Sequence, residues 1–323
     1  MINFSYGKEP YSLRRRDVEA LFDSSDKIAL IQDVEASYDS LMKAFVEFNA
    51  LVYKNTLESL SWTYEPYKEA HKTRVELNIA LASVLNSGRA ITDALGHSEQ
   101  EGSVLRMFDG KSKSKKRPSS VVKNAIEKEY DSNVDYFLMY FSRQFLQPSR
   151  LVVDRMNLKS ATGNNGRVES KLLLFLDLDC LKKSLTMKVE RLDKSGDHKR
   201  SKSITRKIDR LNAIKEPVHI LSSLDGYMNS IGNIICAFRG CVGRIYNEEL
   251  KRHQVAVEGV VESVKHLSRP KGWSGFWFPP SATFKGKKLP LNLEWNLVEH
   301  LTKKNSNPNV ILAMRGVSMN RLE

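Results

Sequence analysis

The sequence is poor in cysteine and has no long apolar run, and both shortages narrow the class of protein it can be. Its three cysteines, Cys180, Cys236 and Cys241, are odd in number and lack Cys-x-x-Cys spacing. Such cysteines predict reduced thiols in a cytoplasmic protein and not a disulfide framework. No run of about 18 apolar residues is present, so no membrane-spanning helix is expected. The N-terminal segment lacks the apolar region of a secretory signal.

Motifs for phosphate loops, dinucleotide folds and metal sites are also missing. The chain contains neither GxxxxGK[ST] nor GxGxxG, and its seven histidines are scattered. Asp177 and Asp179 are a carboxylate pair that a strand would place on a single face. No third acidic ligand stands beside them in the sequence. We therefore predict neither a metal site nor a cofactor.

Positive charge is what the sequence has in excess, with 51 Lys and Arg against 38 Asp and Glu and a net charge of +13. Such a surplus attracts polyanions through its field and through counterion release, although a solvated lysine surface is the simpler explanation. Two polar segments, 108–120 and 188–207, hold much of it, and we expect both to be loops, the first of them mobile. The cations in them that could contact nucleic acid are Lys111, Lys113, Lys115, Lys116, Arg117, Lys199, Arg200, Lys202, Arg206 and Lys207.

The spacing of apolar residues predicts a mainly α fold built from a bundle of long helices. Ser24, Ser25 and Asp26 are expected to cap the first helix, and Gly96 to end a second that spans 71–95. A third is predicted over 119–147, and two more over 221–242 and 248–267. The two longest stripes consist of Ile31, Val34, Tyr38, Leu41, Phe45, Phe48 and Val52, and of Leu221, Leu224, Met228, Ile231, Ile235, Phe238 and Val242.

A small β-hairpin is predicted at about 150–180, where the apolar period changes and Asn164, Asn165 and Gly166 favour a turn. The predicted organisation is an N-terminal arm over 1–26, a helical domain over 27–250 and a C-terminal α/β appendage over 251–323. The appendage would contain a short helix at 291–301 and a strand at 310–314. Its aromatic run, Trp273, Phe276, Trp277 and Phe278, would either stack bases or pin the tail to the bundle.

Two helical segments of the sequence carry a distinctive pattern of polar residues: RVELNIALASVLNSGRAITD, residues 74–93, and EYDSNVDYFLMYFSRQFLQP, residues 129–148. Together they resemble one bacterial branch of the HEPN superfamily. The resemblance covers about 25–245 and implies a HEPN-like helical bundle. It also implies metal-independent RNA cleavage by an Arg and a His four to six residues apart near a helix end, and a homodimer that brings two such helices together.

The catalytic pattern of that superfamily is incomplete here. Arg143, Gln144 and Gln147 match its motif, but Pro148 stands where the histidine is expected. Without that imidazole no general base remains at the position. Arg143 could still bind a phosphate or form a buried ion pair. His97 and His198, the latter following Arg191 at a suitable spacing, are the imidazoles left for a rearranged site.

The expected function is nucleic-acid binding, to RNA rather than DNA, by a catalytically degenerate HEPN-like protein. The resemblance also implies a place in a bacterial anti-phage defence or toxin–antitoxin system. Two alternatives stay open. One is a metal-independent endoribonuclease that uses His97 or His198, and the other is an adaptor that holds a protein partner and binds no nucleic acid.

Overall fold

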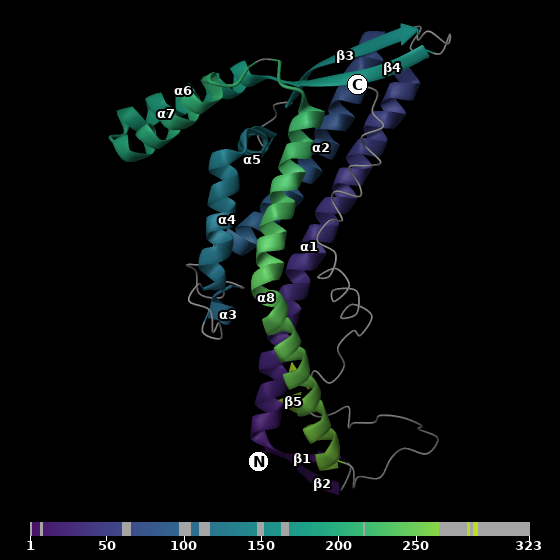
Figure 1. Ribbon diagram of the computed structural model, residues 1–323, viewed down its shortest axis with the longest axis vertical. Helices are drawn as coiled ribbons and strands as arrows, with labels where there is room; N and C mark the ends of the chain where they lie inside the picture. Colours follow the sequence, from purple (N-terminus) through teal and green to yellow (C-terminus); the bar gives the residue numbers. More distant parts are fainter. Residues whose placement is uncertain are drawn as a thin grey trace. The chain divides into compact units, whose positions relative to one another are not determined.

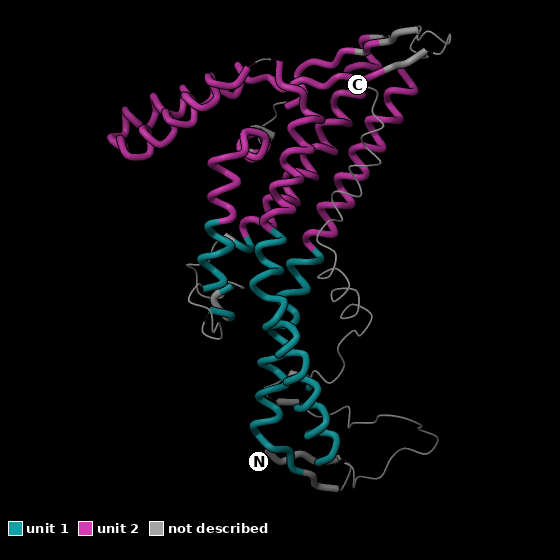
Figure 2. Tube along the Cα trace, viewed as in Figure 1, with its two compact units in different colours: residues 1–36, 94–124, 235–310 teal, residues 37–93, 125–234, 311–323 magenta. Residues whose placement is uncertain are grey.

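The protein is mainly α-helical, which confirms the fold class predicted from its apolar pattern (Figure 1). The computed structural model describes residues 2–6, 9–59, 66–96, 105–109, 117–146, 152–162, 168–215, 217–264, 283–284 and 287–289. These residues form two compact units (Figure 2). Unit 1 contains 1–36, 94–124 and 235–310, and unit 2 contains 37–93, 125–234 and 311–323.

Helices α1 (Arg15–Ser59) and α8 (Ile220–Val264) are 45 residues long and each contributes to both units. In unit 1 they lie side by side and antiparallel, because Ser24 contacts His253 while Glu35 contacts Arg239. The predicted start of the first helix, after Ser24 to Asp26, is wrong. The helix begins nine residues or more earlier, since Val18 and Leu21 extend its buried stripe toward the N-terminus.

The predicted N-terminal arm contains an antiparallel hairpin of β1 (Ile2–Tyr6) and β2 (Glu9–Leu13), followed by the first turns of α1. The two helices predicted over 221–242 and 248–267 are one helix, α8, because buried Ile245, Tyr246 and Val260 continue its stripe. Residues 26 and 250, where the predicted domains end, therefore lie inside continuous helices.

Helix α2 (Pro66–Gly96), most of which belongs to unit 2, ends at the predicted glycine. The single helix predicted over 119–147 is instead two helices, α4 (Pro118–Ser132) and α5 (Val134–Leu146). The break is at Asn133, whose side-chain oxygen accepts hydrogen bonds from the backbone N–H groups of Asp135 at 2.9 Å and Tyr136 at 3.2 Å. Asn133 thus acts as the N-cap of α5, and Val134, predicted to be in the apolar face, is exposed.

The predicted β-hairpin is present as β3 (Val153–Thr162) paired antiparallel with β4 (Val168–Leu176). Leu172 and Leu174 on β4 are buried, whereas Lys171 is exposed, as the alternation of strand side chains requires. Asn78 of α2 holds the beginning of β3, since its side-chain oxygen accepts from the N–H groups of Val152 at 2.7 Å and Val153 at 2.9 Å. The predicted turn at 164–166 lies outside the described residues.

The polar loop predicted over 188–207 is wrong, because the segment folds into two helices, α6 (Leu178–Lys194) and α7 (His198–Asn212). We call them the α6–α7 hairpin. Leu181 and Leu185 on α6 and Ile204 and Leu211 on α7 are buried. These few apolar residues recur at helical spacing among many Lys and Ser residues, and packing the two helices together buries them.

Few other elements are described. They are α3 (Arg106–Asp109), β5 (Thr283–Phe284) and β6 (Lys287–Lys288). The helix at 291–301, the strand at 310–314 and the aromatic run at 273–278 lie outside the described part of the chain. Among the helices that the structure describes, none is both long and apolar enough to cross a membrane.

Two glycines allow helices of unit 2 to approach closely. A Cβ atom on Gly88 of α2 would lie 2.2 Å from the Tyr227 hydroxyl of α8, and one on Gly226 would lie 2.3 Å from the Asp135 carboxylate of α5. Non-bonded heavy atoms do not come this close, so any side chain at these positions would force the helices apart. Tyr227 is fully buried and has little room to move.

Gly88→Ala is therefore expected to lower the free energy of unfolding by about 1–3 kcal/mol, through overpacking against Tyr227. Urea unfolding followed by circular dichroism measures this change. Gly240→Ala is the matched control, because a Cβ atom there meets nothing within 4 Å. Since alanine is the better helix former, the control should be neutral or stabilising by up to about 1 kcal/mol. Equal stability of the two variants would contradict the proposed close approach.

Candidate nucleic-acid interface

The α6–α7 hairpin is strongly basic. Residues 178–212, which span both helices and the turn between them, contain eleven Lys and Arg against five Asp and Glu, so these 35 residues supply about half of the net charge of +13. Two acids of the hairpin have basic side chains beside them: Asp197 pairs with Arg200 at 3.4 Å, and Asp193 lies 3.7 Å from the Nδ1 atom of His198. The exposed cations that form no ion pair with a described residue are Lys183, Lys188, Arg191, Lys194, Lys199, Lys202 and Arg206.

The helical conformation arranges these cations in stripes. Lys199, Lys202 and Arg206 on α7 are spaced by three and four residues and are all exposed, so they share one face. On α6, Lys183, Arg191 and Lys194 recur at spacings of eight and three, which also keeps them near one face. Each helix therefore presents a row of cations to solvent, which a flexible loop would not do.

Lys207 is the predicted contact residue that the fold turns inward. It is half-buried, and its ammonium nitrogen lies 5.1 Å from the centre of the Phe141 ring of α5. Burial lowers the pKa of Lys207, and the positive charge of Lys188 on α6 lowers it further. Lys207 thus helps to attach α7 to α5, and we do not count it among the surface contacts.

A capping aspartate stands at the N-terminal end of each helix of the hairpin. Asp177 accepts a hydrogen bond from the Cys180 N–H at 2.8 Å, and Asp197 accepts one from the Arg200 N–H at 3.2 Å. Gly196 makes the turn between the helices with a φ of 77°, a backbone conformation that favours glycine. Asp177 and Asp179 were predicted to alternate along a strand, which is wrong, because Asp177 is an N-cap and Asp179 lies in the first turn of α6.

The two ends of the hairpin meet at its base. The Leu176 N–H donates to the Val218 carbonyl at 3.1 Å, and Phe175 and His219 form an antiparallel bridge with ring centres 4.8 Å apart. The chain thus leaves β4 and returns to α8 at nearly the same point. In Figure 1 the turn between α6 and α7 lies at the end of the hairpin remote from β4.

Arg210 attaches the hairpin to the rest of unit 2. Its guanidinium donates to the carbonyls of Tyr130 at 2.6 Å and Asp131 at 3.0 Å, at the C-terminal end of α4. The same group lies over the Phe137 ring, 4.1 Å from its centre. A cation at a helix C-terminus is favoured by the helix dipole, and these carbonyls have no partner inside α4. Arg210 therefore sets where α7 lies against α4 and α5.

Arg210→Lys should lower the free energy of unfolding by about 1–3 kcal/mol, because lysine keeps the charge but cannot donate to both carbonyls. Amide hydrogen exchange in α6 and α7 should become faster as the attachment loosens. Arg206→Lys, on the exposed face of the same helix, is the control and should change neither quantity. Unchanged exchange in the Arg210 variant would show that the contact does not hold the hairpin.

Arg143, the arginine of the HEPN-like motif, lies on α5 and faces α2. Its Nε donates to the side-chain oxygen of Asn86 at 2.9 Å, so among the described residues its partner is an amide and not the carboxylate of an ion pair. Beside it, Arg89 forms a two-pronged ion pair with Asp93, at 2.8 and 2.7 Å, and stacks on Tyr140 with 4.6 Å to the ring centre. Burial lowers the pKa of Arg89, but Tyr140 and Asp93 raise it more.

No group beside Arg143 is suited to move a proton near neutral pH, as far as the described residues show. Tyr136 and Tyr227 stack with ring centres 5.5 Å apart, and burial raises the pKa of both well above the usual value. No hydrogen bond between described residues joins Arg143 to a histidine. The described part of this arrangement can hold an anion, and it contains no group suited to act as a general base.

The remaining predicted residues are dispersed. His198 begins α7, at the turn end of the hairpin, and it was wrongly assigned to a loop together with Arg191. Arg117 is exposed just before α4 and belongs to unit 1. His97, Lys111, Lys113, Lys115, Lys116 and the motif positions Gln147 and Pro148 lie outside the described residues.

One histidine contact was not predicted. His71 lies 3.4 Å from an Arg74 guanidinium nitrogen on the exposed side of α2, while Arg74 donates to the Asp154 carbonyl at 3.1 Å. Three polar residues of the two HEPN-like segments thus make structural contacts with backbone groups, namely Arg74, Asn78 and Asn133. In the described part of the chain, no cluster of three metal-ligating side chains is present.

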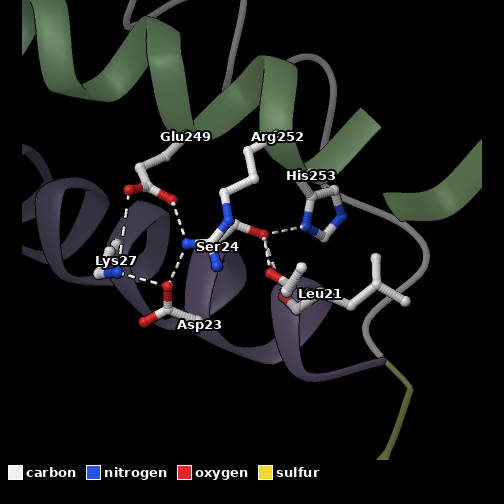
Figure 3. Close-up of polar contacts among 8 residues, drawn as sticks. Leu21, Asp23, Ser24, Lys27, Glu249, Arg252 and His253 are labelled. Carbon is white, nitrogen blue, oxygen red and sulfur yellow. Dashed lines mark hydrogen bonds and ion pairs between the residues drawn. The ribbon is translucent and has the colours of Figure 1, made fainter. Parts of the chain in front are cut away.

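Unit 1 contains a partly buried polar network that the sequence did not indicate (Figure 3). Asp23 of α1 accepts from Lys27 at 2.5 Å and from Arg252 of α8, and Glu249 lies 3.8 Å from the Lys27 ammonium. Ser24 lies 3.0 Å from the Nδ1 atom of His253 and donates to the Ala20 carbonyl at 2.6 Å. Ser24 and His253 are both buried, so this pair is structural rather than a nucleophile open to a substrate.

Asp23→Asn should destabilise the protein near neutral pH and much less in acid. Burial raises the pKa of Asp23, but its hydrogen bonds to Lys27 and Arg252 outweigh this and bring the pKa below its ordinary value of 3.8. A lowered folded-state pKa contributes stability above pH 3.8 that is lost as the pH falls below it. Urea unfolding at pH 6 and pH 3 tests this, with exposed Glu47→Gln as the control. An effect of Asp23→Asn that stays constant over this range would refute the role of the ionised carboxylate.

Comparisons with known proteins identify no relative. No family model matches the sequence, and neither a curated protein nor a solved structure matches the chain. The fold and the site define a mainly α protein with a protruding basic helical hairpin.

Proposed function

We propose that this protein binds RNA through the exposed cations of the α6–α7 hairpin. The observation that carries the proposal is the row formed by Lys199, Lys202 and Arg206 on α7, which are exposed and have no carboxylate partner among the described residues. Cations that only keep a protein in solution are commonly interspersed with acids. Here each uncompensated charge is available to replace a counterion on a phosphate.

The rest of the unit supports a binding role rather than a catalytic one. The hairpin is fixed at its base and along α7, so its cations lie on a scaffold of defined shape. Arg143 is a further cation in the same unit, held by Asn86 without a neutralising acid in the described contacts. Together with the HEPN-like segments, this supports a catalytically inactive HEPN-like RNA-binding protein. From the resemblance alone we extend the proposal to self-association through α5 and to a role in bacterial anti-phage defence or a toxin–antitoxin pair.

The decisive experiment neutralises the α7 row and measures the salt dependence of RNA binding. In the Lys199→Gln, Lys202→Gln, Arg206→Gln triple variant, the slope of log K against log salt should fall by about 2–3, because each cation releases roughly one counterion. Fluorescence anisotropy with labelled RNA over a series of salt concentrations gives the slope. Affinity at low salt should fall by at least about tenfold.

The matched control removes the same charge elsewhere. Lys43, Lys54 and Arg244 are exposed, and each pairs with a glutamate four residues later, at 3.9, 3.6 and 3.0 Å. Replacing all three by Gln should leave the slope unchanged. If the control variant lost binding equally, net charge and not the hairpin would be responsible. If the wild-type protein did not bind RNA at low salt, the proposal would fail in favour of a protein adaptor.

The same assay separates binding from cleavage. RNA recovered after incubation in EDTA should be intact. Metal-independent cleavage that is abolished by His97→Ala or by His198→Ala would replace the binding proposal with an endoribonuclease.

A further inference from the structure

The α6–α7 hairpin contains no phenylalanine, tyrosine or tryptophan. Between Asp177 and Pro217 the sequence has no Phe, Tyr or Trp, although these residues make up 9% of the chain. Proteins that bind single strands combine a basic groove with aromatic side chains, on which the unstacked bases lie. The hairpin provides the cations and lacks these large aromatic side chains, so it gains little from unstacked bases.

The hairpin also has almost none of the amide side chains that read the edge of adenine. Glutamine is absent from 177–217, and the one asparagine, Asn212, ends α7. The exposed positions between the cations of α7 include Ser203 and Thr205. The pairs that distinguish adenine from other bases require Asn or Gln. Lys and Arg can read the O6 and N7 atoms of guanine, but in an RNA duplex these atoms lie in a major groove that side chains cannot enter. Contacts from this surface would therefore go mainly to phosphates and 2′-hydroxyls, which are the same in every sequence.

The cations form a rigid row of fixed length. α6 has 17 residues and α7 has 15, so the helices are about 25 and 22 Å long. Lys199 and Arg206 are separated by about 10 Å along the axis of α7. The caps at Asp177 and Asp197 and the attachment at Arg210 keep this spacing from changing.

A rigid row of cations is best matched by a rigid row of phosphates. A duplex presents its phosphates at fixed positions before binding, whereas a single strand must be ordered along the hairpin at a cost in entropy. In RNA duplexes the major groove is too deep and narrow for side chains to read, and recognition relies on shape, phosphates and 2′-hydroxyls. The surface of the hairpin offers groups for this mode of recognition.

We infer that the α6–α7 hairpin selects double-stranded over single-stranded RNA and binds the duplex without reading its sequence. This inference rests on the proposed function and specifies its substrate class. The duplex contacts the exposed cations of α7 with its phosphates, and no base is unstacked.

The test compares one RNA duplex of 20 base pairs with each of its separated strands, chosen to be unstructured, and with a second duplex of unrelated sequence. Anisotropy titrations of the full chain should give a dissociation constant at least about tenfold lower for the duplexes than for the strands. The two duplexes should agree within about twofold, since base contacts would discriminate by more.

Two variants assign the selectivity to the hairpin. In the first, residues 177–217 are replaced by two glycines, which can join Leu176 to Val218 because their backbone groups are hydrogen-bonded at 3.1 Å. In the second, Lys199, Lys202 and Arg206 are changed to Gln in the intact chain. Both should lose the preference for the duplex. The second variant keeps the test valid even if the first fails to fold.

The possible outcomes separate this inference from the proposed function. If single strands bind as tightly as duplexes and the triple variant abolishes both, RNA binding by the hairpin stands and duplex selection is wrong. If the unrelated duplex binds more than tenfold more weakly, sequence-independent recognition is wrong. If binding of every RNA survives in the triple variant, both proposals fail.

Discussion

The hydrogen bonds of Arg210 to the last carbonyls of α4 are the interaction on which the placement of the basic surface depends. The hairpin has a small apolar interface, made by two sparsely apolar helices, and most of its surface is exposed. A two-helix unit of this kind has little hydrophobic stabilisation of its own. Its position is fixed by a guanidinium that satisfies two backbone acceptors and covers the Phe137 ring.

The break between α4 and α5 makes that interaction possible. A continuous helix would satisfy the carbonyls of Tyr130 and Asp131 internally, four residues later. Asn133 ends this ladder by capping α5, and its amide nitrogen also donates to Ser230 of α8 at 2.8 Å. One asparagine therefore stops a helix, starts the next and leaves acceptors that an arginine from α7 can use.

Polar groups also determine how the long helices pair in unit 1. Between α1 and α8, Glu35 and Arg239 form a buried two-pronged pair at 2.8 and 2.7 Å, and the Asp23, Lys27, Glu249 and Arg252 group lies two turns or more away along α1. Replacing such pairs by apolar residues often costs little, but removing one partner leaves a buried charge. The pairs thus favour one register of two long apolar stripes that could otherwise slide by a heptad.

The sequence by itself determined the mainly α fold, most of the buried positions of α1, α2 and α8, and the β-hairpin, because regular apolar spacing depends only on near neighbours. It did not reveal the break at Asn133, the continuity of α8 as a single helix or the helices within 178–212. An isolated polar helix is marginal in water, and its few apolar residues became a core only when α6 and α7 packed together. The sequence likewise supplied the basic residues, but the tertiary structure decided their roles. Lys207 contacts α5 and Arg210 contacts α4, whereas Lys199, Lys202 and Arg206 remain exposed on one face. The sequence could not show this difference, because the residues that Lys207 and Arg210 contact are about 65 or more positions away in the chain.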